Sequence, residues 1–274
     1  MDPNDIYYCS LYNQGRGHPL FIPEPDDNLP VALQNIGIGI GDLGVWNIDG
    51  SFDVLFNVCQ PATHVANRHG VPESFEPLTL RDKDLLKQTS DLPRSAITST
   101  NVEKANIEGG FSFSSFSRGG VLVLPEGASR VDWIQSRDDV RKFISQNCEK
   151  WHSFVNTDRG RRTSSLFIVT GCDKTTAWGL ASFLGSSESG TLSLTCSDLN
   201  ESEAKWSYEW EGCTPAAVRF SANRAPLMEN QCIFLRGFTL SLRTSEVDQD
   251  YEDDEVAQVR ACDFIEALNS PTRS

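Results

Sequence analysis

The sequence lacks the long apolar runs, export signal and paired cysteines that each mark a large class of proteins. None of its apolar runs approaches the roughly 18 residues that a membrane-spanning helix needs. The opening stretch, MDPNDIYYCS, contains neither a basic cluster nor an apolar segment, so we expect no secretory signal. These absences predict a cytoplasmic protein.

Cysteine and histidine are too scattered for metal chemistry. The 8 cysteines occur singly, without a CxxC pair, and the chain has only 4 histidines. Structural zinc sites use closely spaced ligands of these types, so we expect no metal and no cofactor. Most thiols should be reduced, buried and inert. Cys172 is the best candidate for a Cys–His pair, yet no motif supports it, and we assign no catalytic residue.

Positive charge is scarce overall. The formal net charge is −14, whereas binding to nucleic acid demands a basic footprint, so we expect no nucleic-acid partner. The charge is nevertheless uneven. Residues 102–162 carry 10 basic and 8 acidic residues, whereas residues 244–274 carry 2 basic and 9 acidic residues. The chain therefore has one basic section and one strongly acidic tail.

The basic section contains the clearest secondary-structure signal. Its apolar residues recur at intervals of three and four, which places them on one stripe of a helix. The stripe consists of Val140, Phe143, Ile144, Cys148, Trp151, Phe154 and Val155. Ser136 suits the start, because its hydroxyl can accept a free backbone N–H, and Gly160 suits the stop. We predict a principal amphipathic helix over about 136–155.

Strands are predicted on both sides of this helix. Short apolar runs at 121–124 and 166–169 are typical of buried strands. They are either parallel neighbours joined by a crossover or part of an antiparallel sheet beneath the helix. Apolar and polar residues alternate at 192–195, 206–210 and 238–243, which predicts half-buried antiparallel strands. The fold class is therefore α+β.

Hairpins and loops are predicted elsewhere. Residues 45–48 and 52–58 form a hairpin around Asp49-Gly50, and residues 102–124 form a second one that turns at Arg118-Gly119-Gly120. Residues 1–30 should be extended with little helix. The connection from Cys59 to about Asn101 should be loop, apart from a short helix at 80–88.

We expect one domain over residues 1–243, followed by a tail over residues 244–274. The tail begins with an acidic run, which should form a solvated linker. After it, Val256, Val259, Ile265 and Leu268 could share one face of a short C-terminal helix.

Two stretches resemble nucleotide-binding motifs without meeting their requirements. Gly39–Gly44 fits GxGxxG but leads into a hairpin, whereas a dinucleotide site needs the motif to open a helix. Thr170–Thr176 contains Lys174-Thr175, but Asp173 stands where a phosphate loop needs a glycine. We interpret the first as a glycine-rich strand edge and the second as a turn after a strand.

The basic residues around the helix are the strongest candidates for a binding site. They would meet anionic lipid head groups or an acidic protein segment, and the tail of the same chain is one such segment. The alternative is a solvated helix face with acids mixed in. The candidate residues are Arg130, Arg137, Arg141, Lys142, Arg159, Arg161 and Arg162.

Several stretches resemble a family of uncharacterised proteins from mushroom-forming (basidiomycete) fungi. They are GHPLFIPEP at 17–25, IGDLGVWNIDGSFDVLFNVC at 40–59, VLVLPEGASR at 121–130, FVNTDRGR at 154–161, LFIVTGCDKTTAWGLASF at 166–183 and NQCIFLRGFTLSLR at 230–243. The resemblance implies an intracellular fungal protein and no particular activity.

The order of the predicted elements is also similar, at the level of fold, to gasdermin pore-forming domains. That similarity implies a protein that binds acidic lipid through basic helices, oligomerises on the membrane and opens hairpins into a barrel. The first hypothesis is therefore a non-enzymatic membrane-permeabilising effector restrained by its acidic tail, cytoplasmic until it becomes membrane-associated. The alternatives are a module that binds a protein or small ligand, and an enzyme of unrecognised type.

Overall fold

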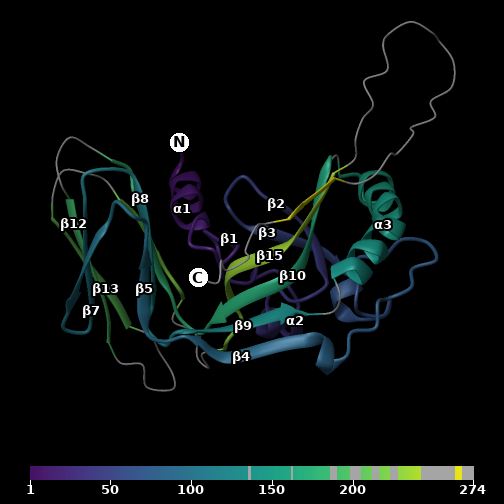
Figure 1. The fold of residues 1–274 in the computed structure, drawn as a ribbon, viewed down its shortest axis with the longest axis horizontal. Helices are drawn as coiled ribbons and strands as arrows, with labels where there is room; N and C mark the ends of the chain where they lie inside the picture. Colours follow the sequence, from purple (N-terminus) through teal and green to yellow (C-terminus); the bar gives the residue numbers. More distant parts are fainter. Residues whose placement is uncertain are drawn as a thin grey trace, which may run out of the picture.

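The fold is mixed α+β and its sheets are antiparallel, as the sequence predicts (Figure 1). The computed structural model describes residues 1–134, 137–161, 163–185, 190–197, 205–211, 216–222, 228–241 and 263–266. Within these ranges it contains one eight-stranded sheet and two four-stranded sheets.

The eight-stranded sheet forms the centre of the molecule. Its strands are β1 (His18–Pro19), β2 (Asp42–Trp46), β3 (Phe52–Asn57), β4 (Leu85–Leu92), β9 (Ala128–Trp133), β10 (Ser165–Thr175), β15 (Gln231–Ser241) and β16 (Asp263–Glu266). The long strand β10 pairs with β15 along one edge, and β2 and β9 share its other edge. Strand β10 therefore connects the two halves of this sheet.

The two four-stranded sheets form a sandwich at one end of the molecule. One contains β5 (Ser95–Thr98), β8 (Gly119–Leu124), β11 (Gly179–Phe183) and β14 (Ala216–Phe220), and the other contains β6 (Glu103–Ile107), β7 (Gly110–Ser115), β12 (Gly190–Ser197) and β13 (Lys205–Glu211). Val121 and Val123 of β8 face the second sheet, where they pack with Phe113 and Leu192. Because side chains alternate along a strand, Leu122 and Leu124 face the other way.

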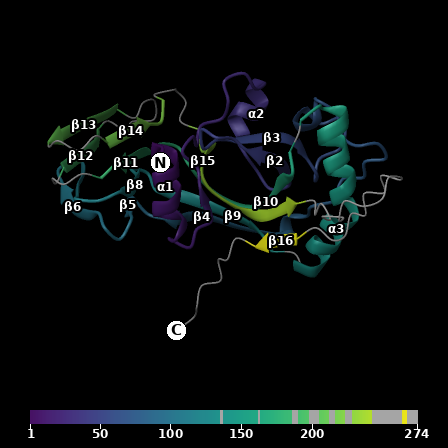
Figure 2. The ribbon, with the colours of Figure 1, turned by 90° about the horizontal axis from the view of Figure 1, so that it is seen from above.

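Three α-helices cover these sheets over the described residues: α1 (Pro3–Tyr12), α2 (Val31–Ile36) and α3 (Arg137–Ser153). Tyr7 and Leu11 of α1 pack on Leu122 and Leu124 of β8, so β8 is buried on both faces. Single turns of 3₁₀ helix occur at Val65–Asn67 and Asp82–Asp84, and a π-helical turn at Phe154–Asp158 follows α3. Figures 1 and 2 both place the sandwich and α3 at opposite ends of the molecule.

Helix α3 confirms the predicted amphipathic helix. Ile144, Cys148 and Trp151 are buried against the eight-stranded sheet, where they meet Ile168 of β10 and Leu240 of β15. Fully burying one large apolar side chain contributes about 1.5–3 kcal/mol, so this stripe holds the helix on the sheet. The predicted cap, Ser136, lies outside the described residues.

The strand before α3 is β9, which lies between the predicted strand at 121–124 and the helix. Strand β9 pairs antiparallel with β10, with Arg130 opposite Asp173. Strand β8, which contains residues 121–124, belongs to a different sheet. The chain therefore passes from β9 through α3 to its antiparallel neighbour, so of the two alternatives the antiparallel sheet is correct.

The N-terminal prediction was wrong, because residues 3–12 are helical. The backbone N–H of Asp2 donates to Asp5 Oδ2 at 3.3 Å, and Pro3 occupies the first helical position, where its missing N–H costs nothing. Tyr7 and Leu11, four residues apart, share the face that packs on β8. Tertiary burial thus selects helix in a segment whose short apolar run suggested extended chain.

The predicted helix at 80–88 and the second hairpin were also wrong. Strand β4 occupies Leu85–Leu92 and pairs with β9, and it is mostly exposed, so its residues show no alternation. The hairpin in residues 102–124 joins β6 to β7 and turns at Gly109, whose φ of 75° favours glycine. Strands β7 and β8 lie in different sheets, so no hairpin turns at Arg118-Gly119-Gly120.

The hairpin around Asp49-Gly50 is confirmed as the pair β2–β3. Its loop is longer than two residues, because the backbone N–H of Asn47 donates to Ser51 O at 3.0 Å and Gly50 has a φ of 81°. This loop lines the pocket described below.

The described part of the tail differs from the predicted short helix. Asp263–Glu266 forms strand β16, which pairs antiparallel with β15, with Ser241 opposite Asp263. An edge strand such as β15 presents unpaired backbone groups, and a short segment can satisfy them by pairing. The acidic run and the other residues of the predicted helix lie outside the described residues.

Among the residues that the structure describes, the free thiols are Cys9, Cys59, Cys172, Cys196 and Cys232. Cys148 of α3 is disulfide-bonded.

Candidate functional site

Arg130, the first candidate cation, belongs to a network of ion pairs that we call the internal ion network. The network consists of Arg16, Asp91, Arg130, Asp132, Asp173 and Arg236. Arg130 pairs with Asp132 on its own strand, so its charge is already compensated. Arg130 is therefore poorly placed to meet lipid.

The centre of this network is the fully buried carboxylate of Asp173. Arg236 donates from Nη1 to Asp173 Oδ1 at 2.8 Å, and Arg16 donates from Nε to Asp173 Oδ2 at 2.7 Å. Arg236 also donates from Nε to Asp132 Oδ1 at 2.6 Å. Burial lowers the pKa of Arg236, but Asp173 and Asp132 raise it above its ordinary value. Charges that alternate and compensate each other in this way stabilise the fold.

The supposed phosphate loop lies within β10 and takes part in this network. Asp173 is held by two arginines, and Lys174 donates from Nζ to the backbone oxygen of Ile36 at 2.6 Å. The expected turn is thus a strand. Gly39–Gly44 leads into β2, and the N–H of Gly39 donates to Asp42 Oδ2 at 2.7 Å, as a strand edge would.

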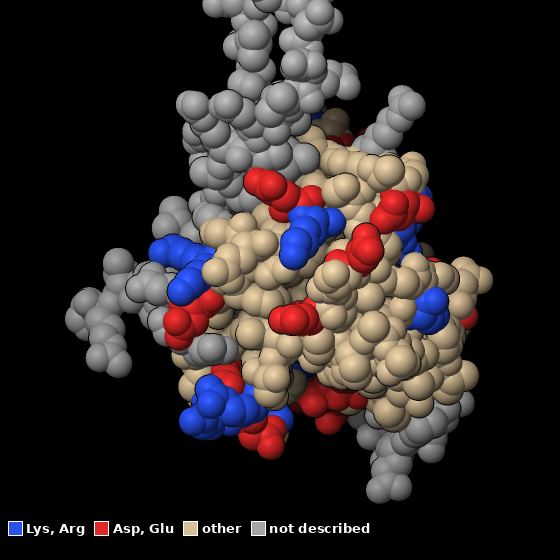
Figure 3. Space-filling view, turned by 90° about the vertical axis from the view of Figure 1, so that its right-hand side faces the viewer, with Lys and Arg blue, Asp and Glu red and all other residues tan. Residues whose placement is uncertain are grey.

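The candidate cations on α3 lie apart from this network. Lys142 is exposed and Arg141 is half-buried. The side chain of Arg137 and all of Arg162 lie outside the described residues. Figure 3 views the molecule from the side that carries α3, and there the cationic side chains lie in separate groups, most with acids beside them. The residues drawn in colour show no continuous basic surface on this face.

Arg159 and Arg161 lie in a second charged group, which we call the Asp53 cluster: Asp53, Arg68, His69, Arg159 and Arg161. Arg161 pairs with Asp53 at 2.5 Å, and Arg159 donates from Nη1 to Leu55 O at 2.8 Å. Burial and the charge of Arg161 lower the pKa of Arg159, while Asp53 opposes them. Arg161 is thus the arginine that pairs with Asp53, while the charges of Arg68 and Arg161 both act on Arg159. The sequence pattern predicted Arg159 and Arg161 but not Arg68.

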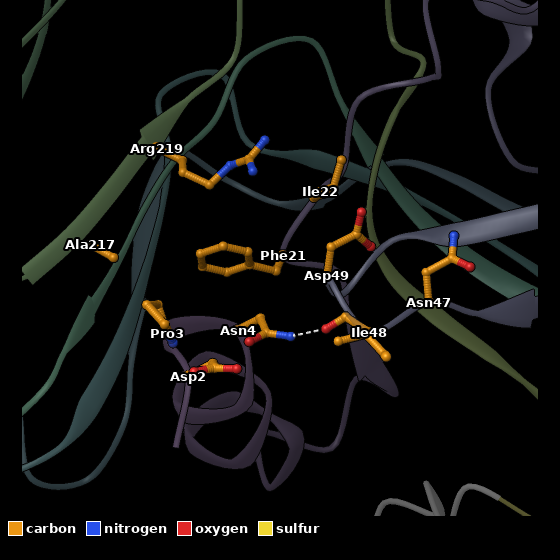
Figure 4. A pocket seen from close by; sticks show the side chains of 10 residues that line it. All are labelled: Asp2, Pro3, Asn4, Phe21, Ile22, Asn47, Ile48, Asp49, Ala217 and Arg219. Carbon is orange, nitrogen blue, oxygen red and sulfur yellow. Dashed lines mark hydrogen bonds between the residues drawn. The ribbon is translucent and has the colours of Figure 1, made fainter.

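A pocket of about 620 Å³ lies between the sandwich and the central sheet (Figure 4). We call it the α1–β14 pocket, because it opens beside the first turn of α1, the β2–β3 loop and β14. Its apolar lining is Pro3, Phe21, Ile22, Ile48 and Ala217. Its polar lining is Asp2, Asn4, Asn47, Asp49 and Arg219.

The ring of Phe21 lies in the middle of the pocket, with Arg219 above it in Figure 4. The guanidinium carbon of Arg219 is 5.3 Å from the centre of this ring, a distance typical of a cation–π contact. Arg219 pairs through Nη2 with Glu24 Oε1 at 2.5 Å. Its Nε is buried and has no hydrogen-bond partner. Arg219 therefore keeps an unused donor.

Asp49 lies on the other side of the pocket and is hydrogen-bonded within its own turn. Its Oδ1 accepts hydrogen bonds from Ser51 N at 2.9 Å and from Ser51 Oγ at 2.6 Å. These bonds, with a smaller contribution from the charge of Arg219, lower the pKa of Asp49. No salt bridge joins Asp49 to Arg219 or to any other residue that the structure describes. Asn4 Nδ2 donates to Ile48 O at 2.5 Å and fixes the loop against α1.

A group of aromatic rings near the pocket surrounds His18. The Tyr8 hydroxyl and His18 Nδ1 are 2.7 Å apart, and the imidazole lies 5.3 Å from both the Trp46 and Phe167 rings. Burial lowers the pKa of His18 to about 4 and raises the pKa of Tyr8 to about 12. Neither residue lines the pocket. We interpret this group as packing.

The described residues contain neither a candidate metal site nor a candidate membrane-spanning helix. No group of three or more His, Cys, Asp or Glu in that part of the chain could hold a metal ion. No helix among the residues placed in the structure is long and apolar enough to cross a membrane. Comparison of the chain with protein-family models and with curated proteins finds no match. The fungal and gasdermin resemblances therefore stay predictions.

Sequence reasoning missed the α1–β14 pocket. Its key residues, Phe21, Asp49 and Arg219, come from three distant segments, and each has an unremarkable local context. Asp49 was interpreted as part of a turn, which it is. The available signal was an apolar residue, Ile48, directly before the Asp49-Gly50 turn, and the structure leaves this residue 94% exposed.

Proposed function

We propose that the protein is a non-enzymatic binding module that holds a small ligand in the α1–β14 pocket. The observation that carries this proposal is the pocket itself, which has an apolar floor and two opposite charges that do not pair with each other. Ligand pockets characteristically combine apolar walls with a few fixed polar groups. This is the alternative hypothesis from the sequence, with the small ligand chosen over a protein.

The residue types around the pocket favour binding over catalysis. Its titratable lining groups are two aspartates and an arginine. A general acid or base works best when its pKa is near the pH of the solution, whereas Ser51 lowers the pKa of Asp49 further from neutrality. None of the lining residues is a histidine, cysteine or serine that could serve as a nucleophile or its base.

A variant that fills the pocket tests this proposal. Compounds from a fragment library would be scored by the rise they cause in melting temperature, which reports binding to the folded state. We expect some to stabilise the wild-type chain and to lose this effect in Ala217→Trp. The matched control is Ala105→Trp on the exposed strand β6, which should keep it. Compounds that stabilise all three proteins equally would contradict the proposal.

The second candidate is the membrane effector, and the Asp53 cluster favours it. Arg161 pairs with Asp53, and the charges of Arg68 and Arg161 both lower the pKa of Arg159, so the cluster has more positive than negative charge to offer an anionic head group. The acidic tail would restrain them, and the effector would oligomerise once bound. It ranks second because the described strands of the sandwich hairpins span five to eight residues, whereas a membrane strand needs about 9–11.

Liposomes test this candidate. Full-length protein and a chain ending at Arg243 would be compared for dye leakage from acidic and neutral vesicles. We expect leakage from acidic vesicles only, and more from the shorter chain. Charge reversal in Arg68→Glu and Arg161→Glu should abolish it, whereas Lys87→Glu, far from the cluster in sequence, should not. If neither chain leaks dye or sediments with acidic vesicles, the membrane candidate is wrong.

A further inference from the structure

We propose that the ligand of the α1–β14 pocket is a zwitterion with an apolar side chain, of the amino-acid or short-peptide type. Its ammonium group would meet Asp49, its carboxylate would meet Arg219, and its apolar side chain would lie on Phe21. This inference rests on the proposed function and specifies the ligand class of the same pocket.

The carboxylate of Asp49 and the guanidinium of Arg219 both line the pocket but do not form a salt bridge with each other. The charge of Arg219 contributes to the lowered pKa of Asp49, so the two groups are within electrostatic reach. Neither uses the other as a salt-bridge partner: Arg219 pairs with Glu24, and Asp49 is bound by Ser51. A ligand with one charge of each sign can satisfy both groups at once.

Arg219 keeps one unpaired donor in spite of its pairing with Glu24. The salt bridge uses Nη2, which leaves the buried Nε–H without an acceptor. A buried donor without a partner costs free energy, and a ligand oxygen that reaches it recovers that cost. A carboxylate suits this role best, because hydrogen bonds between two charged groups are stronger than neutral ones.

The acidic side of the pocket is complementary to an ammonium group. Asp49 and Asp2 both line the pocket, while Arg219 shares its charge with Glu24, so the lining is acidic overall. The hydrogen bonds from Ser51 keep the Asp49 carboxylate ionised and fixed in place. A cation placed beside Asp49 also lies away from the guanidinium that would repel it.

The apolar part of the ligand has a defined surface to cover. Phe21 is half-buried, and its ring packs edge-on against Tyr7 of α1, with 5.7 Å between the ring centres. Pro3 and Ala217 lie on one side of it in Figure 4, and Ile48 lies below. An aromatic or branched aliphatic side chain would displace water from these groups.

Four probes that differ in charge test the inference by titration calorimetry. L-phenylalanine and the dipeptide Gly-Phe carry both charges at different spacings. Phenethylamine lacks the carboxylate, and hydrocinnamate lacks the amine. We expect at least one zwitterion to bind roughly tenfold or more tightly than either singly charged probe, because each loses one charged hydrogen bond.

Two variants assign each charge to its residue. Asp49→Asn keeps an oxygen for Ser51 and removes only the charge, so it should weaken the zwitterion and phenethylamine but not hydrocinnamate. Arg219→Lys keeps the charge and removes the Nε donor, so it should weaken the zwitterion and hydrocinnamate but not phenethylamine. The matched control is Asp82→Asn, at an exposed aspartate outside the pocket, and it should change none of the affinities.

The outcomes separate this inference from the proposed function. Equal binding of phenylalanine, Gly-Phe and either singly charged probe would overturn the inference, as would equal weakening of all probes by Asp49→Asn. If no probe binds but other compounds bind in a manner that Ala217→Trp abolishes, the ligand class is wrong and the proposed function stands. If nothing binds the pocket, both fail.

Discussion

The internal ion network and the Asp53 cluster contain similar side chains but differ in how far their charges are compensated. In the network, three arginines alternate with three aspartates, and the central Asp173 is fully buried. In the cluster, three arginines lie within electrostatic reach of one another, and only Arg161 pairs with the aspartate, near the surface. Burial requires charges to be compensated within the protein, whereas solvent tolerates an excess. The second candidate function therefore rests on the Asp53 cluster and not on the internal ion network.

The largest expected effect comes from the centre of the network. Asp173→Ala should lower the free energy of unfolding by roughly 3–5 kcal/mol, because it leaves Arg16 and Arg236 buried beside a missing partner. Urea denaturation measures the loss. The counterpart in the exposed group, Asp53→Ala, should cost less than about 1 kcal/mol. Similar losses in the two variants would remove the distinction between the groups.

Burial should also separate two histidines in their response to acid: His18 of the buried aromatic group and His69 of the Asp53 cluster. Burial lowers the pKa of His18 from 6.5 to about 4. The unfolded chain then takes up this proton first, so His18 makes stability fall as the pH drops from about 6.5 to 4. His18→Asn should remove this loss, which reaches up to roughly 3 kcal/mol near pH 4. The pKa of His69 in the Asp53 cluster is also lowered, by slight burial and by the charges of Arg68 and Arg159, but the residue is exposed and solvent screens these charges. His69→Asn should therefore give the smaller effect and is the comparison.

The measurement is the difference between wild type and variant in urea denaturation at pH 7 and pH 4.5. A difference is needed because burial raises the pKa of Asp42 to about 6, and this group acts in the opposite direction. Its folded form takes up the proton first, so Asp42 adds stability as the pH falls from about 6 to 4. Parallel stability curves for the wild type and His18→Asn would contradict the prediction.

The geometry of the network can be tested without removing a charge. A Cβ atom on Gly171 would lie 2.3 Å from Asp132 Oδ1 and 2.6 Å from Arg236 Nε. Gly171→Ala should therefore force this pair apart and cost about 1–3 kcal/mol in thermal or urea unfolding. Gly39→Ala is the matched control, because a Cβ there meets no atom within 4 Å. An equal loss at both glycines would mean that space around the ion pair does not matter.

The smallest effect should appear in binding. Asp53→Asn removes the carboxylate that pairs with Arg161 in the Asp53 cluster, so it should strengthen sedimentation with acidic liposomes by about fivefold. The gain should shrink as salt is added, because exposed charges are screened. Asp82→Asn removes the same charge elsewhere and should have no such effect. An equal gain in the control would show that net charge, rather than this cluster, controls adsorption.

Regular patterns made part of the fold predictable. The stripe of α3 follows from spacing alone, because Ile144, Cys148 and Trp151 must all face one surface. The alternating run at 192–195 likewise predicted the buried Leu192 and Leu194 of β12. Strand β4 was missed because it is mostly exposed, so its apolar and polar residues do not alternate. Helix α1 was missed because the apolar residues of its short run are not spaced regularly at three and four positions. The secondary structure of such segments depends on the strand they pair with or the sheet they pack on, and these partners are distant in the sequence.

The candidate site was less predictable than the fold. The basic residues near the helix formed one group in the sequence, but Arg130 lies in the internal ion network and Arg159 in the Asp53 cluster. Whether the charge of an arginine is compensated depends on acidic residues from distant segments, such as Asp173 and Asp53. The pocket joins Phe21, Asp49 and Arg219 in the same way. Proximity in the sequence therefore could not distinguish basic residues that are paired within the fold from basic residues that could bind a partner.

The internal ion network also has a consequence for how fast the chain can fold. Its hydrogen bond from Arg236 Nη1 to Arg16 O joins residues 220 positions apart, and Asp91, Asp132 and Asp173 come from three further segments. Closing such long loops must precede any gain from the contacts, which slows folding. During synthesis, Arg16 cannot contact Arg236 until β15 has been translated. The central sheet should therefore be the last part of the molecule to become native.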